Sequence, residues 1–175
     1  YAMSVQENIP MTSGETGGFK NSDFRDDIKA TAEKPIFFDL KVQMLKQGRT
    51  NTPVCKTDNM WGVVKVYASG GENGLHAHTK EDHIFLIMQG SACFFGPNGE
   101  ERHAGTHEGI LLAKGCYYNF QCTSKEPLVL FRIGCHTAHE EGIAGRLNLE
   151  GGAMAGDHKD NKQVEVIYDE GVYFE

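Results

Sequence analysis

Long apolar runs and clusters of basic residues are both missing from this chain of 175 residues. No apolar stretch approaches the roughly 20 residues that cross a bilayer, and none precedes a small-residue cleavage site near the start. The net charge is −7, which argues against a nucleic-acid partner. The five cysteines form no CxxC pair, so we expect no disulfide framework. These absences predict a cytoplasmic protein with neither a membrane nor a nucleic-acid partner.

What the chain does contain is typical of a globular protein built from short strands. Hydrophobic residues make up 39% of it and glycines number 21, which favours one cored domain with many tight turns. Segments such as "SGGENG", "GPNGEE" and "TSKEP" have the composition of turns and separate short apolar or alternating runs. The runs that we expect to be strands are Ile36–Met44, Met60–Ala68, Ile84–Met88, Ala92–Phe95, Ile110–Ala113, Tyr117–Cys122 and Leu128–Ile133. Strands at this spacing predict an all-β antiparallel sandwich or barrel.

The character of the sequence changes twice along the chain and divides it into three parts. Residues 1–33 are polar, and we expect a partly disordered N-terminal arm in which Ser22 caps a short helical turn. Residues 34–140 are expected to form the barrel domain. Residues 141–175 contain a loop followed by "QVEVIYDEGVYF", which alternates like a terminal pair of strands. We expect this extension to pack on the barrel or along a sheet edge of a partner subunit, which predicts a homodimer.

Three of the eight histidines stand close together in "GLHAHTKEDHIFLIMQG". His76 and His78 are two residues apart, so on an extended strand both side chains point to the same face. His83 has the wrong parity for that strand, so "TKED" must turn and bring the next strand back beside the first. The three imidazoles can then face one interior point, where a transition metal would accept them. The alternative is a solvated turn that two histidines decorate while the third caps a strand.

The same segment resembles the first motif of the cupin superfamily. That motif is a glycine, five residues, HxH, three or four residues, Glu, six residues and a glycine. Gly70, His76, His78 and Gly90 match it. His83 occupies the position of the family's glutamate in the longer spacing, and it keeps the six residues before Gly90. The resemblance therefore has its main departure at a ligand position.

Two further positions bear on the ligand set that the resemblance implies. Asp82 fits the shorter spacing of the first motif, so either Asp82 or His83 completes the triad, and we favour His83. The second cupin motif is matched most nearly by "HEGILLAKGCYYNFQC", where Gly115 agrees, Ala113 replaces a proline and Tyr118 takes the place of a histidine ligand. Tyr118 is then an anionic fourth ligand, a neutral donor to substrate or a general acid–base, or else a packed aromatic residue.

The resemblance covers roughly residues 60–135. It implies a cupin-type double-stranded β-helix, a jelly-roll barrel, that holds one divalent transition metal through His76, His78 and His83. Fe, Zn, Ni, Mn or Co would suit, with Fe or Zn favoured. The implied function is a small metal-dependent oxidoreductase of the non-haem dioxygenase type that acts on a small organic substrate, with Tyr118 as a catalytic residue. The alternatives are an oxygen-independent isomerase, lyase or cyclase, and a non-catalytic ligand-binding protein.

Other polar residues near the predicted site have alternative roles. Glu81 and Asp82 either orient the imidazoles or face solvent. Arg132 either binds an anionic substrate inside the barrel or, as we expect, faces outward. His136 follows a strand and can approach the pocket from a barrel end. The remaining candidates are expected to be rim residues, His103 and His107, and small core residues, Cys93, Cys116 and Cys122.

Overall fold

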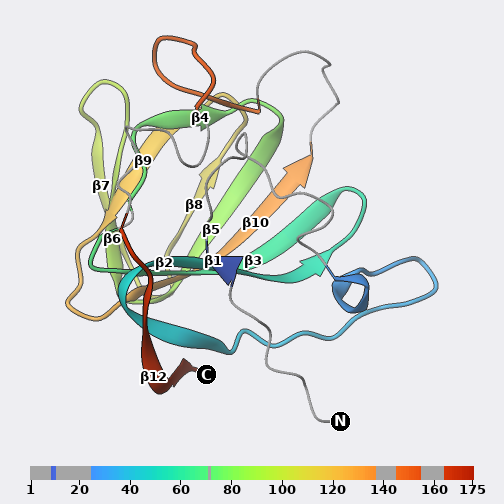
Figure 1. Cartoon of the computed structure of the whole chain (residues 1–175). Helices are drawn as coiled ribbons and strands as arrows, with labels where there is room; N and C mark the ends of the chain where they lie inside the picture. Colours follow the sequence, from blue (N-terminus) through green and yellow to red (C-terminus); the bar gives the residue numbers. More distant parts are fainter. Residues whose placement is uncertain (1–8, 11–24, 71, 137–144, 155–163) are drawn as a thin grey trace.

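The computed structural model describes residues 9–10, 25–70, 72–136, 145–154 and 164–175. Its strands fall into two antiparallel sheets (Figure 1). The larger sheet contains β1 (Ile9–Pro10), β2 (Val42–Lys56), β3 (Met60–Ala68), β5 (Glu81–Gln89), β8 (Gly109–Leu112), β10 (Leu128–His136) and β12 (Ile167–Phe174). The smaller sheet contains β4 (His76–His78), β6 (Ser91–Phe95), β7 (Glu101–Gly105), β9 (Tyr117–Cys122) and β11 (Arg146–Leu147).

The order of the strands identifies the architecture. The larger sheet runs β1–β2–β3–β10–β5–β8, and the smaller runs β11–β4–β9–β6–β7. From β3 to β6, and again from β7 to β10, successive strands alternate between the two sheets. This alternation winds the chain into a double-stranded β-helix, so the predicted all-β jelly-roll fold of the cupin type is confirmed.

The larger sheet is apolar on both faces, and each face packs on a different core. The inner core fills the space between the sheets and includes Tyr67, Phe85, Ile87, Phe94, Tyr118, Phe120, Leu128 and Leu130. The outer core lies on the opposite face of β3 and includes Val42, Leu45, Val54, Val64, Val66 and Val129. Because neighbouring residues of a strand point to opposite faces, β3 serves both cores, and its residues 61–68 are all buried.

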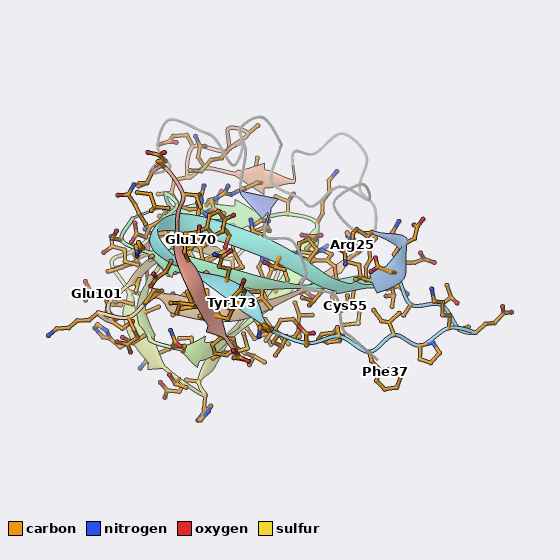
Figure 2. The ribbon with its side chains drawn as sticks, turned by 60° about the horizontal axis from the view of Figure 1, so that its bottom comes forward. Arg25, Phe37, Cys55, Glu101, Glu170 and Tyr173 are labelled. Atoms are coloured by element: carbon orange, nitrogen blue, oxygen red, sulfur yellow. The ribbon has the colours of Figure 1, made fainter. Side chains whose placement is uncertain are left out.

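Strand β2 changes partners at Gly48. Its second half pairs with β3 from Gly48 to Lys56, while its first half pairs with β12, which crosses it in both views (Figures 1 and 2). Gly48 has a φ of 84°, and a Cβ there would lie 2.9 Å from the carbonyl oxygen of Glu165. β12 is one irregular strand rather than the expected pair, and Val166, just before it, packs against the outer core. The C-terminal segment therefore packs on the barrel of its own chain.

The bounds of the strands differ from the prediction most in segments that are rich in polar residues. β3 and β9 have the predicted bounds. The prediction of a strand over Ile36–Met44 is wrong in extent, because β2 begins at Val42 and runs through "QGRTNTP" to Lys56. Arg49 and Asn51 are buried within that run, so polar residues occupy positions where apolar ones would reveal a strand. Strand β7 was not predicted either, because its residues are mostly exposed and polar and show no apolar face.

The N-terminal part of the described chain contributes little regular structure. A turn of 3-10 helix, η2 (Asp26–Ile28), precedes β2 and buries Ile28, while the expected cap Ser22 lies outside the described residues. Phe37 projects from the body of the protein and is 89% exposed (Figure 2). In the ranges that the structure describes, no helix is both long and apolar enough to cross a bilayer.

Three apolar side chains are exposed on the outer face of β5 and β8. Their exposed fractions are 37% for Ile84, 43% for Leu86 and 72% for Leu111. Ile84 and Leu111 are direct cross-strand neighbours, so the apolar surface is continuous. The expected homodimer stays a prediction, and multi-angle light scattering of the purified protein would measure it.

Replacing Gly48 by alanine should loosen the junction between β2 and β12. The new methyl group would meet the Glu165 carbonyl, and the positive φ disfavours any side chain. We expect urea denaturation to show a loss of about 1–3 kcal/mol, together with faster amide exchange in Val42–Gln47. Gly105→Ala is the matched control, because a Cβ there has one ordinary contact at 3.8 Å. Equal stability of the two variants would contradict the role of Gly48.

Candidate functional site

Two of the three histidines come from β4, the short strand of the smaller sheet. His76 pairs with Tyr118 on β9, and His78 pairs with Arg146 on β11. Both histidines are buried, with 2% and 6% of their surfaces exposed. The expected same-face geometry therefore places both imidazoles inside the barrel, and the alternative of a solvated turn is wrong.

Strand alternation decides which residues of β5 join them. Glu81, His83 and Phe85 are buried along β5 and share its inner face. Asp82 lies on the other face, where its carboxylate accepts a hydrogen bond at 2.8 Å from the backbone amide of Lys114. His83, and not Asp82, therefore faces the other histidines, and Glu81 enters the same space.

The imidazoles and the carboxylate lie close together. Ring centroids are 5.2 Å apart for His76 and His78, and 4.3 Å apart for His78 and His83. The possible ligand atoms of His78, Glu81 and His83 all lie within 4.8 Å of one another. His76 donates its Nδ1 proton to the carbonyl of Gly74 at 2.7 Å, which leaves the Nε2 lone pair free of that bond.

Glu81 is held by groups from three strands. Trp61 of β3 donates its indole proton to Oε1 at 2.9 Å, and His83 donates from Nε2 to Oε2 at 3.1 Å. His136, at the end of β10, is 3.3 Å from Oε1, so it does approach the pocket. Burial raises the pKa of Glu81, but the hydrogen bonds from His83 and Trp61 outweigh it and lower that pKa to about 2. The carboxylate is therefore charged, and it fixes the orientation of His83.

All three histidines are neutral at neutral pH. Burial, followed by nearby arginines, lowers the pKa values of His76 and His78 well below their ordinary value. Burial and Arg132 lower the pKa of His83 to about 4. Neutral imidazoles keep a nitrogen lone pair, which is the state that a metal ligand requires.

Arg132 lies among these histidines, and the expectation that it faces outward is wrong. Its Nη2 is 3.3 Å from Nε2 of His78, and 3.1 and 3.3 Å from the two nitrogens of His83. Nearly equal distances to both nitrogens place it over the face of the His83 ring rather than along one lone pair. The guanidinium carbon also lies 5.0 and 5.3 Å from the ring centres of Trp61 and Phe85. These aromatic faces stabilise a cation that the sequence pattern alone assigns to solvent.

The Trp61 indole occupies space that is free because Gly134 has no side chain. A Cβ on Gly134 would lie 2.2 Å from Cζ2 of the Trp61 indole, so the ring lies directly over this glycine. Gly134 is the cross-strand neighbour of both Trp61 and His83. The glycine thus makes the hydrogen bond from Trp61 to Glu81 sterically possible.

Tyr118 is buried beside His76. Their ring centroids are 4.7 Å apart, and Tyr118 is 4% exposed. Burial raises the pKa of the phenol, so it is protonated in the metal-free barrel. Its catalytic role stays a prediction, since a protonated, buried phenol fits both a neutral hydrogen-bond donor and a packed aromatic residue of the inner core.

Two buried cations of the interior were not singled out by the sequence patterns. Lys65 stands in the middle of the apolar strand β3, and Arg146 pairs with His78, yet each is 3% exposed. A charged residue inside the apolar run "WGVVKVYA" is the signal that could have revealed Lys65. The position of Arg146 beside the site is evident only from the pairing of its strand with β4.

Residues expected at the periphery behave mostly as predicted. His103 and His107 are both exposed, which confirms the rim assignment. His103 groups with Cys93 and Glu101, but only Cys93 of that group is buried. Cys116 is exposed rather than part of the core, because it precedes β9 in a turn.

No family model matches the sequence, and neither does any curated protein. The cupin domain of Schizosaccharomyces pombe Cnp3 is similar over 53% of this chain and 68% of its own, at 18% identity and a TM-score of 0.48. A double-stranded β-helix domain protein from Klebsiella pneumoniae is similar over 57% of this chain and 82% of its own, at 19% identity and a TM-score of 0.47. A cupin superfamily protein from Desulfitobacterium hafniense covers 54% and 83%, at 12% identity and a TM-score of 0.47. Because every score is below 0.5, we carry no activity over from these proteins.

Replacing Trp61 by phenylalanine should destabilise the protein by removing the donor to Glu81. A hydrogen bond to a buried charge is worth about 1.5–3 kcal/mol, and urea denaturation followed by circular dichroism would measure the loss. Tyr117→Phe is the matched control, because it removes one bond, at 3.0 Å, to the neutral carbonyl of Asn148. A double-mutant cycle with Glu81→Gln separates the hydrogen bond from lost ring contacts, and zero coupling would refute the assignment.

Proposed function

We propose that the barrel binds one divalent transition metal among His76, His78 and His83, with Glu81 beside them, and acts as a small metal-dependent enzyme of the dioxygenase type. The observation that carries the proposal is the convergence of three neutral imidazoles and an ionised carboxylate in one buried space. Neutral nitrogen donors with one carboxylate suit Fe or Zn, and also Ni, Mn or Co. Bound iron would supply oxygen chemistry there, whereas zinc would supply a Lewis acid.

The chain's own residues position the donors and hold protons. Glu81 accepts the Nε2 proton of His83 and thereby fixes which ring nitrogen carries it. The carbonyl of Gly74 does the same for His76. Tyr118 presents a protonated phenol beside His76, from which it can donate a hydrogen bond to an oxygen of the substrate. Phe85, which contacts the rings of His83 and Tyr118, restricts water in this space.

Arg132 occupies part of the space that a metal would take among these residues. Its guanidinium contacts His78 and His83, and its charge repels another cation. The position of an internal cation among the imidazoles supports the fit of the donor set to a cation. It also means that metal loading requires Arg132 to turn away from the rings.

The same contacts favour a second candidate, a barrel that binds a small ligand without catalysis. In that case Arg132 stays among the histidines and serves the ligand directly. An oxygen-independent isomerase, lyase or cyclase would use the same metal donors. Oxygen-electrode measurements with diketones, phenols and thiols separate the three cases, because only a dioxygenase consumes dioxygen in step with the substrate.

Removing either histidine of β4 should abolish metal binding. We expect the purified protein to carry roughly one transition-metal ion per chain, and His76→Ala and His78→Ala to carry close to none. Element-resolved metal analysis measures the content. Cobalt titration followed by the fluorescence of Trp61, the one tryptophan, whose ring centroid is 5.7 Å from that of His83, measures the affinity.

His107→Ala is the matched control, because His107 is an exposed histidine that belongs to neither group of possible metal ligands. This variant should keep the full metal content. Wild-type protein that stays metal-free after reconstitution with each candidate metal would overturn the proposal.

Replacing Arg132 by methionine should strengthen metal binding. The change removes a positive charge in contact with two candidate ligands while keeping a long apolar side chain against Trp61 and Phe85. We expect the affinity for cobalt to rise by about tenfold or more in the same titration. Arg102→Met, at an exposed site on β7, should leave the affinity unchanged. Unchanged or weaker binding in Arg132→Met would show that the guanidinium does not compete.

A further inference from the structure

The interior of the barrel contains more positive than negative charge. Lys65, Arg132 and Arg146 are buried, with exposed fractions of 3%, 7% and 3%. Within the described ranges, Glu81 is the only carboxylate that is buried. A buried charge is costly unless an opposite charge or hydrogen bonds compensate it. One carboxylate does not balance this set, so an additional anion would stabilise the interior.

Several donors of this interior lack partners. The Nε and Nη2 atoms of Arg146, the Nε atom of Arg132 and the hydroxyl of Tyr67 are buried and have no hydrogen-bond partner in the part of the chain that is described. Nearly all buried polar groups in proteins have a hydrogen-bond partner, so each unsatisfied donor calls for a partner beyond the residues that the structure describes. Four such atoms in one barrel point to a bound ligand with acceptor oxygens.

These groups enter the interior from both sheets. Arg146 lies on β11 of the smaller sheet, opposite His78. Lys65 and Tyr67 share the inner face of β3 in the larger sheet, with the ammonium 5.2 Å from the centre of the Tyr67 ring. The charges act on one another across the barrel, since burial and then Arg132, Arg49 and Arg146 lower the pKa of Lys65 well below its ordinary value. The buried basic residues thus come from both sheets and are close enough to influence one another.

Arg146 has the geometry of an oxyanion receptor. Its two unpartnered atoms, Nε and Nη2, lie on the same edge of the planar guanidinium, where their N–H bonds point in the same direction. This edge matches two oxygens of a carboxylate or phosphate. Burial lowers the pKa of Arg146 to about 10, so the guanidinium still carries its charge at neutral pH.

We propose that the barrel binds a small organic oxyanion, a carboxylate or a phosphate, on the side edge of Arg146, with Lys65 and the Tyr67 hydroxyl as further donors. The proposal names the substrate class of the metal-dependent reaction and in that respect rests on the proposed function. The binding of the anion itself depends only on the buried cations. A substrate held on Arg146 lies next to His78, so its remaining atoms reach the candidate metal ligands.

The test measures anion binding to metal-free and metal-loaded protein. Isothermal titration with succinate, inorganic phosphate and the neutral analogue succinamide is carried out at constant ionic strength. We expect succinate or phosphate to bind and succinamide to bind at least about tenfold more weakly, because it lacks the charge. Whichever of the two anions binds tighter identifies the carboxylate or the phosphate as the natural group.

Two variants connect the binding to the named residues. Arg146→Gln should weaken anion binding by about tenfold or more, and Lys65→Met should weaken it independently. Arg102→Gln, at an exposed arginine of β7, should bind as the wild type does. The ligand-free Arg146→Gln protein should unfold no earlier than the wild type, because it loses an uncompensated buried charge. A merely structural arginine would instead lower the unfolding temperature.

Wild-type protein that binds neither anion, or variants at both Arg146 and Lys65 that bind as tightly as wild type, would overturn the inference. Metal analysis of the same samples separates it from the proposed function. Metal without anion binding rejects the oxyanion site alone, whereas anion binding without metal rejects the metal-dependent enzyme alone.

Discussion

A buried carboxylate connects the strands on which the candidate site is built. Glu81 belongs to β5, receives the indole proton of Trp61 from β3 and approaches His136 on β10. These three strands are neighbours in the larger sheet, with β10 between the other two. Because Glu81 also accepts a proton from His83, the position of that imidazole depends on the indole, and the indole depends on the bare backbone of Gly134. The geometry of the candidate ligands thus depends on contacts between several strands.

Glu81 also accounts for the altered motif. His83 stands where the motif that this sequence resembles has glutamate, so this position carries no negative charge. Strand alternation returns a carboxylate to the same face, because Glu81 precedes His83 by two residues. The interior therefore contains one carboxylate beside three imidazoles. With Arg132 and Arg146 in the same space, the balance of charge favours an anionic ligand.

Features that depend on residues close together in the sequence could be predicted, whereas those that depend on distant strands could not. Same-face spacing of His76 and His78 is local, and it predicts their shared orientation correctly. The same rule applied to Glu81 and His83 would have included the carboxylate in the site. Arg132 and Arg146 could not be placed this way, because their surroundings come from distant strands and from aromatic rings across the barrel. Local periodicity carries no information about such pairings.

The pairing of β2 with β12 has a consequence for how the chain acquires its structure. The first half of β2 is synthesised early, but its partner in the sheet follows only after every other described strand. Until then, the backbone groups and apolar side chains of Val42 and Leu45 are uncovered, and an open edge of this kind can pair with another chain. Contacts between distant parts of a chain also form slowly. The outer core can therefore be completed only after β12 has been synthesised.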